Sequence, residues 1–203
     1  MRSGKQTKDE LLALAVQMFA ADGFQKTSLR SITKQAGVSP ALMIHHFGTK
    51  DKLIDLAIVT TLGDWVAKEK LAMLDDQENQ LSSWQSIMEQ GVTQLNFFRH
   101  VLIAGGKYAG RLFDVAVLES EALLKTVAEN GQLKKVSDPH VTAILMTLSG
   151  MGSLILMEHI ERHLGGSIAS PEVAHKLMVA NNEMLQDGTF VLPEQTKEEK
   201  VGS

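Results

Sequence analysis

The sequence contains no cysteine, and its 203 residues include only four prolines and 5% aromatic side chains. A chain without cysteine has no disulfide, no cysteine-ligated zinc site and no thiol nucleophile. It also lacks runs of alternating β-branched residues, so no strand is predicted. A hydrophobic fraction of 44% and a charged fraction of 22% are typical of soluble globular proteins. They exclude a disordered or collagen-like chain.

The sequence has no apolar run of the length that a membrane span needs. The most apolar stretch covers residues 141–157, which are 17 uncharged residues that include threonine, serine and glycine. A spanning helix needs about 20 predominantly apolar residues, so we expect a helix buried on nearly all sides and no membrane partner. The N-terminus meets Asp9 and Glu10 early and has no cleavage site of small residues. We therefore expect a cytoplasmic protein.

What the sequence does contain is helix start and stop signals. Three of its four prolines, Pro40, Pro139 and Pro171, follow a serine or an aspartate, as they do at helix N-termini. Thr7 and Glu10 have the spacing of a capping box. These signals predict an all-α protein of about nine helices. The expected ranges are 7–23, 28–37, 40–46, 49–74, 82–94, 96–109, 112–130, 138–164 and 170–186.

Charge is distributed unevenly along the chain. Residues 1–52 contain eight basic and four acidic residues, whereas the remaining 151 contain 12 basic and 20 acidic ones. A basic N-terminal part suits a polyanionic partner, and an acidic remainder does not. Chance variation among solvated faces is the alternative interpretation.

Residues 27–53 predict two short helices that are joined by a tight turn. Gly37 supplies the positive φ that such a turn needs, and Val38 can fill the angle between the helices. This is helix-turn-helix geometry, in which the second helix enters the major groove of DNA. Taken alone, the pattern fits any αα-hairpin equally well.

The segment from Thr7 to Trp65 resembles the TetR family of bacterial transcriptional regulators. The matching features are Gly23–Phe24, Thr27, Ile32, Ala36–Gly37–Val38–Ser39, His46–Phe47, Thr49–Lys50 and Leu53. The resemblance implies a three-helix DNA-binding domain over residues 5–65, with its motif at 28–47. It also implies a helical effector-binding domain over 66–190, and a homodimer formed by the last two helices. The polar residues 191–203 are predicted to be disordered.

The resemblance also implies which residues contact double-stranded operator DNA. Arg30 would reach a base or a phosphate, and Lys50 would hold a phosphate at a helix N-terminus. The other implied contacts are Thr27 and Ser28 to a phosphate, and Pro40, Ala41, Leu42, His45 and His46 on the groove side of the second helix. A half-buried His46 and a merely solvated Lys50 are the alternatives.

Leu42 and Ile44 depart from the family pattern. The family commonly has a small polar residue and a tyrosine at these positions, and both can bind a phosphate, whereas leucine and isoleucine cannot. We therefore expect Leu42 to touch a thymine methyl group and Ile44 to pack inward. Phosphate binding would then rely more on Lys50, Arg30 and the N-terminal Arg2, Lys5 and Lys8.

Aromatic and methionine side chains in the middle of the chain are the candidates for an effector pocket. They are Trp65, Met88, Phe97, Phe98, Tyr108 and Phe113. The scarcity of charge in these helices favours a small apolar or amphipathic effector. Ordinary core packing is the alternative for each of them.

The chain has no evident catalytic or cofactor site. His159 and His163 have the i, i+4 spacing of metal ligands, but Ile160 stands where a zinc hydrolase has glutamate. We interpret this pair as a helix-end cap and predict no metal and no cofactor. No activated serine, acid–base pair or phosphate-binding loop is found, so the chain is not predicted to be an enzyme.

The function predicted from the sequence is that of a ligand-responsive, sequence-specific DNA-binding regulator. It would repress transcription and release its operator when a small molecule binds. The alternative is a helical ligand-binding or scaffolding protein whose helix-turn-helix no longer grips a specific site. Leu42 and Ile44 are the residues that favour this alternative.

Overall fold

The computed structural model describes residues 4–74, 82–83, 86–88, 91–131, 136–168 and 170–186. Within these residues every regular element is a helix, which confirms the predicted all-α class. The N-terminal helices are α1 (Gly4–Lys26), α2 (Leu29–Ala36), α3 (Pro40–Phe47) and α4 (Lys50–Leu74). The others are α6 (Val92–Ala104), α7 (Gly106–Glu129), α8 (Pro139–Ile155), α9 (Met157–Leu164) and α10 (Pro171–Gln186).

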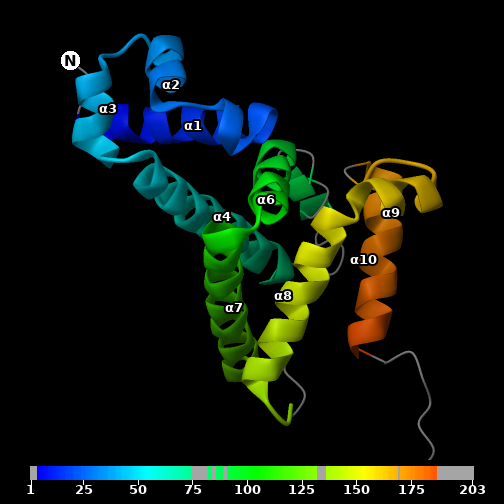
Figure 1. The fold of residues 1–203 in the computed structure, drawn as a ribbon. Coiled ribbons are helices and arrows are strands. Elements are labelled where there is room, and N and C mark those ends of the chain that lie inside the picture. Colours follow the sequence, from blue (N-terminus) through cyan, green and yellow to red (C-terminus); the bar gives the residue numbers. More distant parts are fainter. Residues whose placement is uncertain are drawn as a thin grey trace, which may run out of the picture.

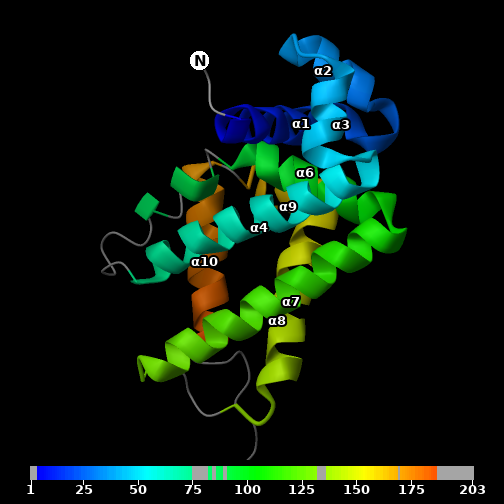
Figure 2. The same cartoon turned by 90° about the vertical axis from the view of Figure 1, so that its left-hand side faces the viewer.

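Helices α1 to α3 form a small unit at one end of the molecule, which we call the head (Figure 1). Helix α4 leads from the head into the remaining helices, which we call the body. Helix α6 packs extensively against α1, and α7 packs against both α4 and α8. Figure 2 shows the head resting on α6 and α4, with α7 crossing the body below them.

The predicted helix starts are confirmed where a small polar residue precedes proline. The Ser39 side chain accepts a hydrogen bond from the Leu42 N–H at 3.2 Å, and Asp138 does the same for Val141 at 3.1 Å. Each bond satisfies one of the backbone donors that a helix N-terminus leaves unpaired. Helix α10 begins in the same way after Ser170.

Several predicted boundaries are wrong. Helix α1 begins at Gly4, so Thr7 lies inside the helix and is not its N-cap. Helix α6 continues through Asn96 without a break. It ends at Ala104, before the Gly105–Gly106 pair, which was the alternative to an end near Ala109. The long helix expected over 138–164 is two helices, α8 and α9, bent by 75° at Leu156.

A single hydrophobic core joins the head to the body. Phe19 and Phe24 of α1 pack against Phe97 of α6, with ring centroids 6.4 and 5.8 Å from that of Phe97. Ile32 and Met43, from α2 and α3, are completely buried in the same cluster. Each such side chain contributes about 1.5–3 kcal/mol by leaving water. The position of the head is therefore tied to the packing of the body.

The face of α8 contradicts the expectation of a helix buried on nearly all sides. Only Ala143 and Thr147 of this helix are buried, whereas Val141, Leu145 and Leu148 are 48–60% exposed. Helix α10 makes only slight contact with the other described helices. It likewise exposes Leu177, Val179 and Met184. Both helices therefore present apolar surface that a single chain leaves uncovered.

In the part of the chain that the structure describes, no helix is by itself long and apolar enough to cross a membrane. Only α8 and α9 taken together reach that length and apolarity, across their 75° bend. The interval between the predicted helices 49–74 and 82–94 and the predicted disordered tail at 191–203 lie outside the described residues.

Candidate nucleic-acid interface and ligand cleft

The turn between α2 and α3 has the predicted helix-turn-helix geometry. Gly37 adopts a left-handed conformation with φ 68° and ψ 29°. Its N–H and the Val38 N–H both donate to the last carbonyls of α2. A residue with a Cβ is strained at such a φ. The partly buried Val38 packs against the core, as expected.

Helix α3 has one buried side and one exposed side. Met43 and Phe47 are 0% and 5% exposed and anchor the helix to the core. The opposite side is made of exposed or partly buried residues, namely Pro40, Ala41, Leu42, Ile44, His45 and His46. The expectation that Ile44 packs inward is wrong, because its side chain is 58% exposed. Successive helical residues are rotated by about 100°, so Ile44 turns away from the core that Met43 enters.

His46 lies at the boundary between the two sides of α3. Its side chain is partly buried, and its Nε2 atom has no hydrogen-bond partner among the described residues. Its ring packs edge-on against those of His45 and Phe47, at 5.3 and 6.1 Å. His45, by contrast, is exposed. Of the two imidazoles, His45 is therefore the more exposed.

Helix α2 presents basic side chains on the outer surface of the head. Arg30 and Lys34 are exposed, and neither has an ion-pair partner among the described residues. Ser28 is the N-cap of α2 and forms a reciprocal capping box with Ser31, with bonds of 2.9 and 3.0 Å. Such an N-terminus carries partial positive charge and unpaired N–H groups, which suit a phosphate.

Thr27 has a structural position that removes it from the candidate DNA contacts. Its side chain is 1% exposed, and its hydroxyl donates to the carbonyl oxygens of Gly23 at 2.9 Å and Met18 at 3.3 Å. Its N–H also donates to Gly23. Both donors are therefore used to close the end of α1, and the expected phosphate contact of this residue is wrong.

Lys50, the first residue of α4, is partly buried, and its ammonium donates to the backbone carbonyl of Phe24. The bond ties the start of α4 to the end of α1. An ammonium group has three N–H donors, so two remain for a phosphate. Lys50 is thus more than the solvated charge of the alternative interpretation.

Four charged side chains and a tyrosine join the start of α4 to the start of α7. We call this group the clasp. Asp51 accepts hydrogen bonds from Lys107 and Tyr108, and Asp55 accepts one from Arg111 at 2.8 Å. The bonds from Lys107 and Tyr108 lower the pKa of Asp51, and Asp51 raises the pKa of Lys107. The clasp holds α4 only a few residues after α3 ends.

Sequence reasoning did not identify the clasp. The partners are 56 or 57 residues apart in the chain, so no local pattern connects them. The available signal was a matched spacing. Asp51 and Asp55 are four residues apart on one helix, and Lys107 and Arg111 are four apart on another. Such pairs lie on the same face of each helix.

The predicted effector-pocket residues other than Trp65 do not line the one cleft that is described. Phe97 and Phe98 are 0% and 4% exposed in the core, and the Tyr108 hydroxyl donates to Asp51. Phe113 packs in a second hydrophobic cluster between α7 and α8. Met88 is half-buried. Core packing, the alternative named above, therefore accounts for Phe97 and Phe98.

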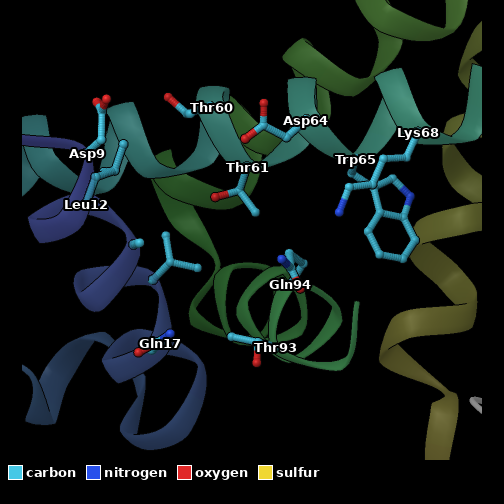
Figure 3. A pocket seen from close by; sticks show the side chains of 12 residues that line it. Asp9, Leu12, Gln17, Thr60, Thr61, Asp64, Trp65, Lys68, Thr93 and Gln94 are labelled. Atoms are coloured by element: carbon cyan, nitrogen blue, oxygen red, sulfur yellow. The ribbon is translucent and has the colours of Figure 1, made fainter. Parts of the chain in front are cut away.

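Trp65 is the one member of that set that lines the described cleft between α1, α4 and α6. The cleft has a volume of about 610 Å³, within the usual range for small-molecule sites. Figure 3 shows its side chains converging from the three helices. The lining residues are Asp9, Leu12, Ala13, Val16, Gln17, Thr60, Thr61, Asp64, Trp65, Lys68, Thr93 and Gln94.

Two contacts hold the Trp65 ring in place. Its Nε1–H donates to Glu69 at 2.7 Å, and Gly91 lies directly against its six-membered ring. A Cβ at position 91 would be 2.3 Å from the ring, so only glycine fits. Burial raises the pKa of Glu69, and the hydrogen bond from Trp65 opposes that effect.

His159 and His163 are both exposed on α9. The neighbouring carboxylates have other partners: Glu158 pairs with Arg99 at 2.5 Å, and Glu161 accepts bonds from Ser167 and the Ile168 N–H. Across the described ranges no three histidine or acidic side chains gather in a way that could hold a metal ion. His163 lies in the last turn of α9, as a helix-end cap would, whereas His159 lies in the first turn.

Two family models match the chain. The model of bacterial regulatory proteins of the tetR family matches residues 11–57, and the model of the tetracyclin repressor-like C-terminal domain matches residues 89–191, about half of the chain. The regulatory protein RaaS of Mycobacterium tuberculosis is 28% identical over 182 residues, which cover 86% of this chain and 82% of that protein. The repressor KstR2 of the same species is 32% identical over 80 residues, 39% of this chain and 40% of its own.

Solved structures share the fold over most of the chain. A putative TetR-family regulator from Rhodococcus has a TM-score of 0.66 at 16% identity and covers 89% of this chain and 98% of its own. FadR from Bacillus subtilis, solved in complex with stearoyl-CoA, has a TM-score of 0.64 at 14% identity, with coverages of 90% and 99%. Because the matched models account for both the head and the body, this chain belongs to the TetR family of bacterial transcriptional regulators.

Proposed function

We propose that this ligand-responsive, DNA-binding regulator is a homodimeric repressor that reads its operator with α3. The observation that carries the proposal is the two-sided character of α3. Met43 and Phe47 bind it to the core, while Ile44 and His45 project from the opposite side. A helix held in this way can enter the major groove without unfolding its own domain. Arg30 and Lys50 supply charge beside it.

The dimer is proposed to form through α8 and α10. This proposal is supported by the apolar surface that both helices leave uncovered. Leu145 of α8 is 60% exposed and Met184 of α10 is 62% exposed. Large uncovered apolar patches are uncommon on monomeric proteins and mark interaction surfaces. A two-fold axis there would place two copies of α3 on successive turns of the duplex.

Repression and small-molecule release are proposed by likeness to relatives. KstR2, which resembles 39% of this chain, is named a transcriptional repressor, and FadR has the same fold and was solved with stearoyl-CoA. We propose a regulatory rather than a catalytic role, and a cytoplasmic one because the operator is there.

A gel mobility-shift assay with the DNA upstream of the chain's own gene tests the proposal. We expect the protein to bind that fragment at least about 100-fold more tightly than random DNA of equal length. Equal affinity for the two would instead support the ligand-binding or scaffolding alternative.

A variant pair sharpens this assay. Arg30→Ala should weaken operator binding, because the arginine is exposed on the head beside α3. Lys125→Ala removes an equally exposed charge from the far part of α7 and should leave binding unchanged. Equal effects of the two changes would remove Arg30 from the interface.

A further inference from the structure

We infer that the cleft between α1, α4 and α6 binds a polyhydroxylated ring compound of about the size of a monosaccharide, either uncharged or cationic. The inference rests on the proposed function, because it assigns the effector's site and chemical class. This cleft is not the aromatic pocket that the sequence predicted. Of the six residues predicted for that pocket, Trp65 is the one that also lines this cleft.

The first argument is that the polar side chains of the cleft are unengaged. None of them forms a side-chain hydrogen bond or an ion pair with another described residue. They are Asp9, Gln17, Thr60, Thr61, Asp64, Lys68 and Thr93. Elsewhere on α4, Asp51, Asp55 and Glu69 all have partners. The seven lining groups are therefore available to a ligand in the cleft.

One further lining residue has a buried polar atom without a partner. The Oε1 atom of Gln94 is buried and accepts no hydrogen bond from the described residues. A buried acceptor that is left unpaired lowers stability. A ligand that donates to this oxygen would supply the missing hydrogen bond.

The second argument is the kind of group that lines the cleft. Three threonine hydroxyls and the two glutamine amides can each donate and accept a hydrogen bond. Each hydroxyl of a polyhydroxylated ring can likewise both donate and accept a hydrogen bond. Apolar surface for the C–H face of such a ring comes from Leu12 and Val16 on α1 and from Trp65 on α4. Figure 3 shows Thr60, Thr61 and Gln94 between the α1 side and the Trp65 side.

Charge decides among ring compounds of similar shape. Asp9 and Asp64 provide two carboxylates, whereas Lys68 provides one ammonium. An anionic ring would therefore meet net repulsion, and a neutral or amino-substituted ring would not. Sugar acids should bind more weakly than the corresponding sugars.

The position of the cleft provides a route to regulation. Asp9 and Gln17 belong to α1 in the head, whereas Thr93 and Gln94 belong to α6 in the body. A ligand that touches both stabilises one orientation of the head on the body. It changes operator affinity by the ratio of its affinities for the competing orientations.

The test uses Trp65 as the reporter. The chain has two tryptophans, so Trp84→Phe leaves Trp65 as the sole indole of the full-length protein. Fluorescence is titrated with glucose, galactose and mannose, and with the amino sugar and the uronic acid of each. We expect saturable binding of at least one neutral or amino sugar, and binding of its uronic acid about tenfold weaker or more. No response to any sugar, or equal binding of the uronic acid, overturns the inference.

Lining variants locate the binding. Asp64→Asn and Thr60→Val should each weaken the sugar about fivefold or more, and both positions are exposed enough to tolerate the change. Asp114→Asn is the matched control, an exposed aspartate on α7 outside the cleft, and should bind the sugar as the parent does. Unchanged binding in both lining variants overturns the site.

A mobility shift on the same preparation separates the two proposals. Binding of the upstream DNA with no sugar response overturns the ligand site and leaves the repressor proposal standing. Loss of all specific DNA binding with an intact sugar response overturns the repressor proposal instead. We expect the bound sugar to change operator affinity about fivefold or more, and a bound sugar without that change overturns its role as the effector.

Discussion

At the residue scale, Ile44 shows that neighbouring residues of one helix can face opposite environments. It follows the fully buried Met43, yet its own side chain is 58% exposed on the outer side of α3. An isoleucine in the major groove can contact the methyl group of thymine but cannot hydrogen-bond a base edge. We therefore assign it to base discrimination rather than to phosphate binding.

Ile44→Ala should lower affinity for the operator by about fivefold to tenfold, the effect of about 1 kcal/mol of lost apolar contact. Affinity for random DNA should stay the same, because the phosphate contacts remain. Competition binding with labelled operator and unlabelled random DNA measures both. Leu118→Ala, equally exposed at 62% on α7, should change neither. Equal losses on both DNAs would mean that Ile44 supports the fold of α3 and reads no base.

Lys50→Ala should weaken binding to operator and to random DNA about equally, because a phosphate contact carries no sequence information. The slope of log affinity against log salt should become shallower by about one. Since the Lys50 ammonium also holds the Phe24 carbonyl, the Tm should fall slightly as well. A lower Tm with an unchanged salt slope would leave Lys50 with a structural role only.

At the scale of elements, the clasp links the start of α4 to α7 in the body, and the start of α4 is joined to α3. Only Gly48 and Thr49 separate the end of α3 from the start of α4. A shift of the first turn of α4 must therefore move α3. Because Asp51 and Asp55 bind this turn to α7, α7 helps to set the position of the recognition helix.

The double change Asp51→Asn, Asp55→Asn should weaken operator binding about threefold to tenfold through misplacement of α3. Electrostatics alone predicts the opposite result, because the protein loses two negative charges near DNA. The ratio of operator to random-DNA affinity, measured at one salt concentration, distinguishes the two effects. A ratio as high as that of the parent protein would show that the clasp does not position α3. Asp114→Asn serves as the control.

Glu69→Gln should stabilise the protein at neutral pH. Burial raises the pKa of Glu69 above its usual 4.5, so ionisation costs more in the folded state than in the unfolded state. This destabilisation is absent below the unfolded pKa, where the carboxyl is protonated in both states, and it is complete above the folded pKa. Glutamine keeps the acceptor for Trp65 without the charge.

Urea unfolding at pH 7.5 and at pH 4 measures the effect of Glu69→Gln. The variant should have the higher free energy of unfolding at pH 7.5, and the difference should shrink at pH 4. An equal difference at both pH values would show that the charge of Glu69 is not its cause.

Assembly belongs to the scale of the whole molecule. Leu145→Glu places a charge in the uncovered face of α8, where leucine is 60% exposed. If that face meets its copy across a two-fold axis, the two charges face a desolvated interface and the dimer dissociates. We expect the mass of a monomer by light scattering and a loss of operator affinity of about 100-fold, since each protomer then binds alone.

Ile103→Glu provides the comparison for assembly. Ile103 is 61% exposed, close to the value for Leu145, but it lies at the end of α6. This variant should remain dimeric. A Leu145→Glu protein that is still dimeric would mean that the protomers associate through another surface.

Local features of this protein were predictable from its sequence. The caps at Ser28, Ser39 and Asp138 and the left-handed turn at Gly37 depend on side chains within a few residues of the backbone they serve. A cap or a tight turn needs only its own short segment, so its signal survives without knowledge of the fold. The helix-turn-helix, which is built from these parts, could be predicted for the same reason.

Tertiary structure alone decided the features that join distant segments. The clasp, the cleft, the exposure of Ile44 and the inward bonds of Thr27 all depend on which helix lies opposite. The apolar face of α8 illustrates the physical reason. A helix rich in apolar residues is consistent with burial in its own chain or against a second copy, and only the packing of its neighbours shows which face is left uncovered.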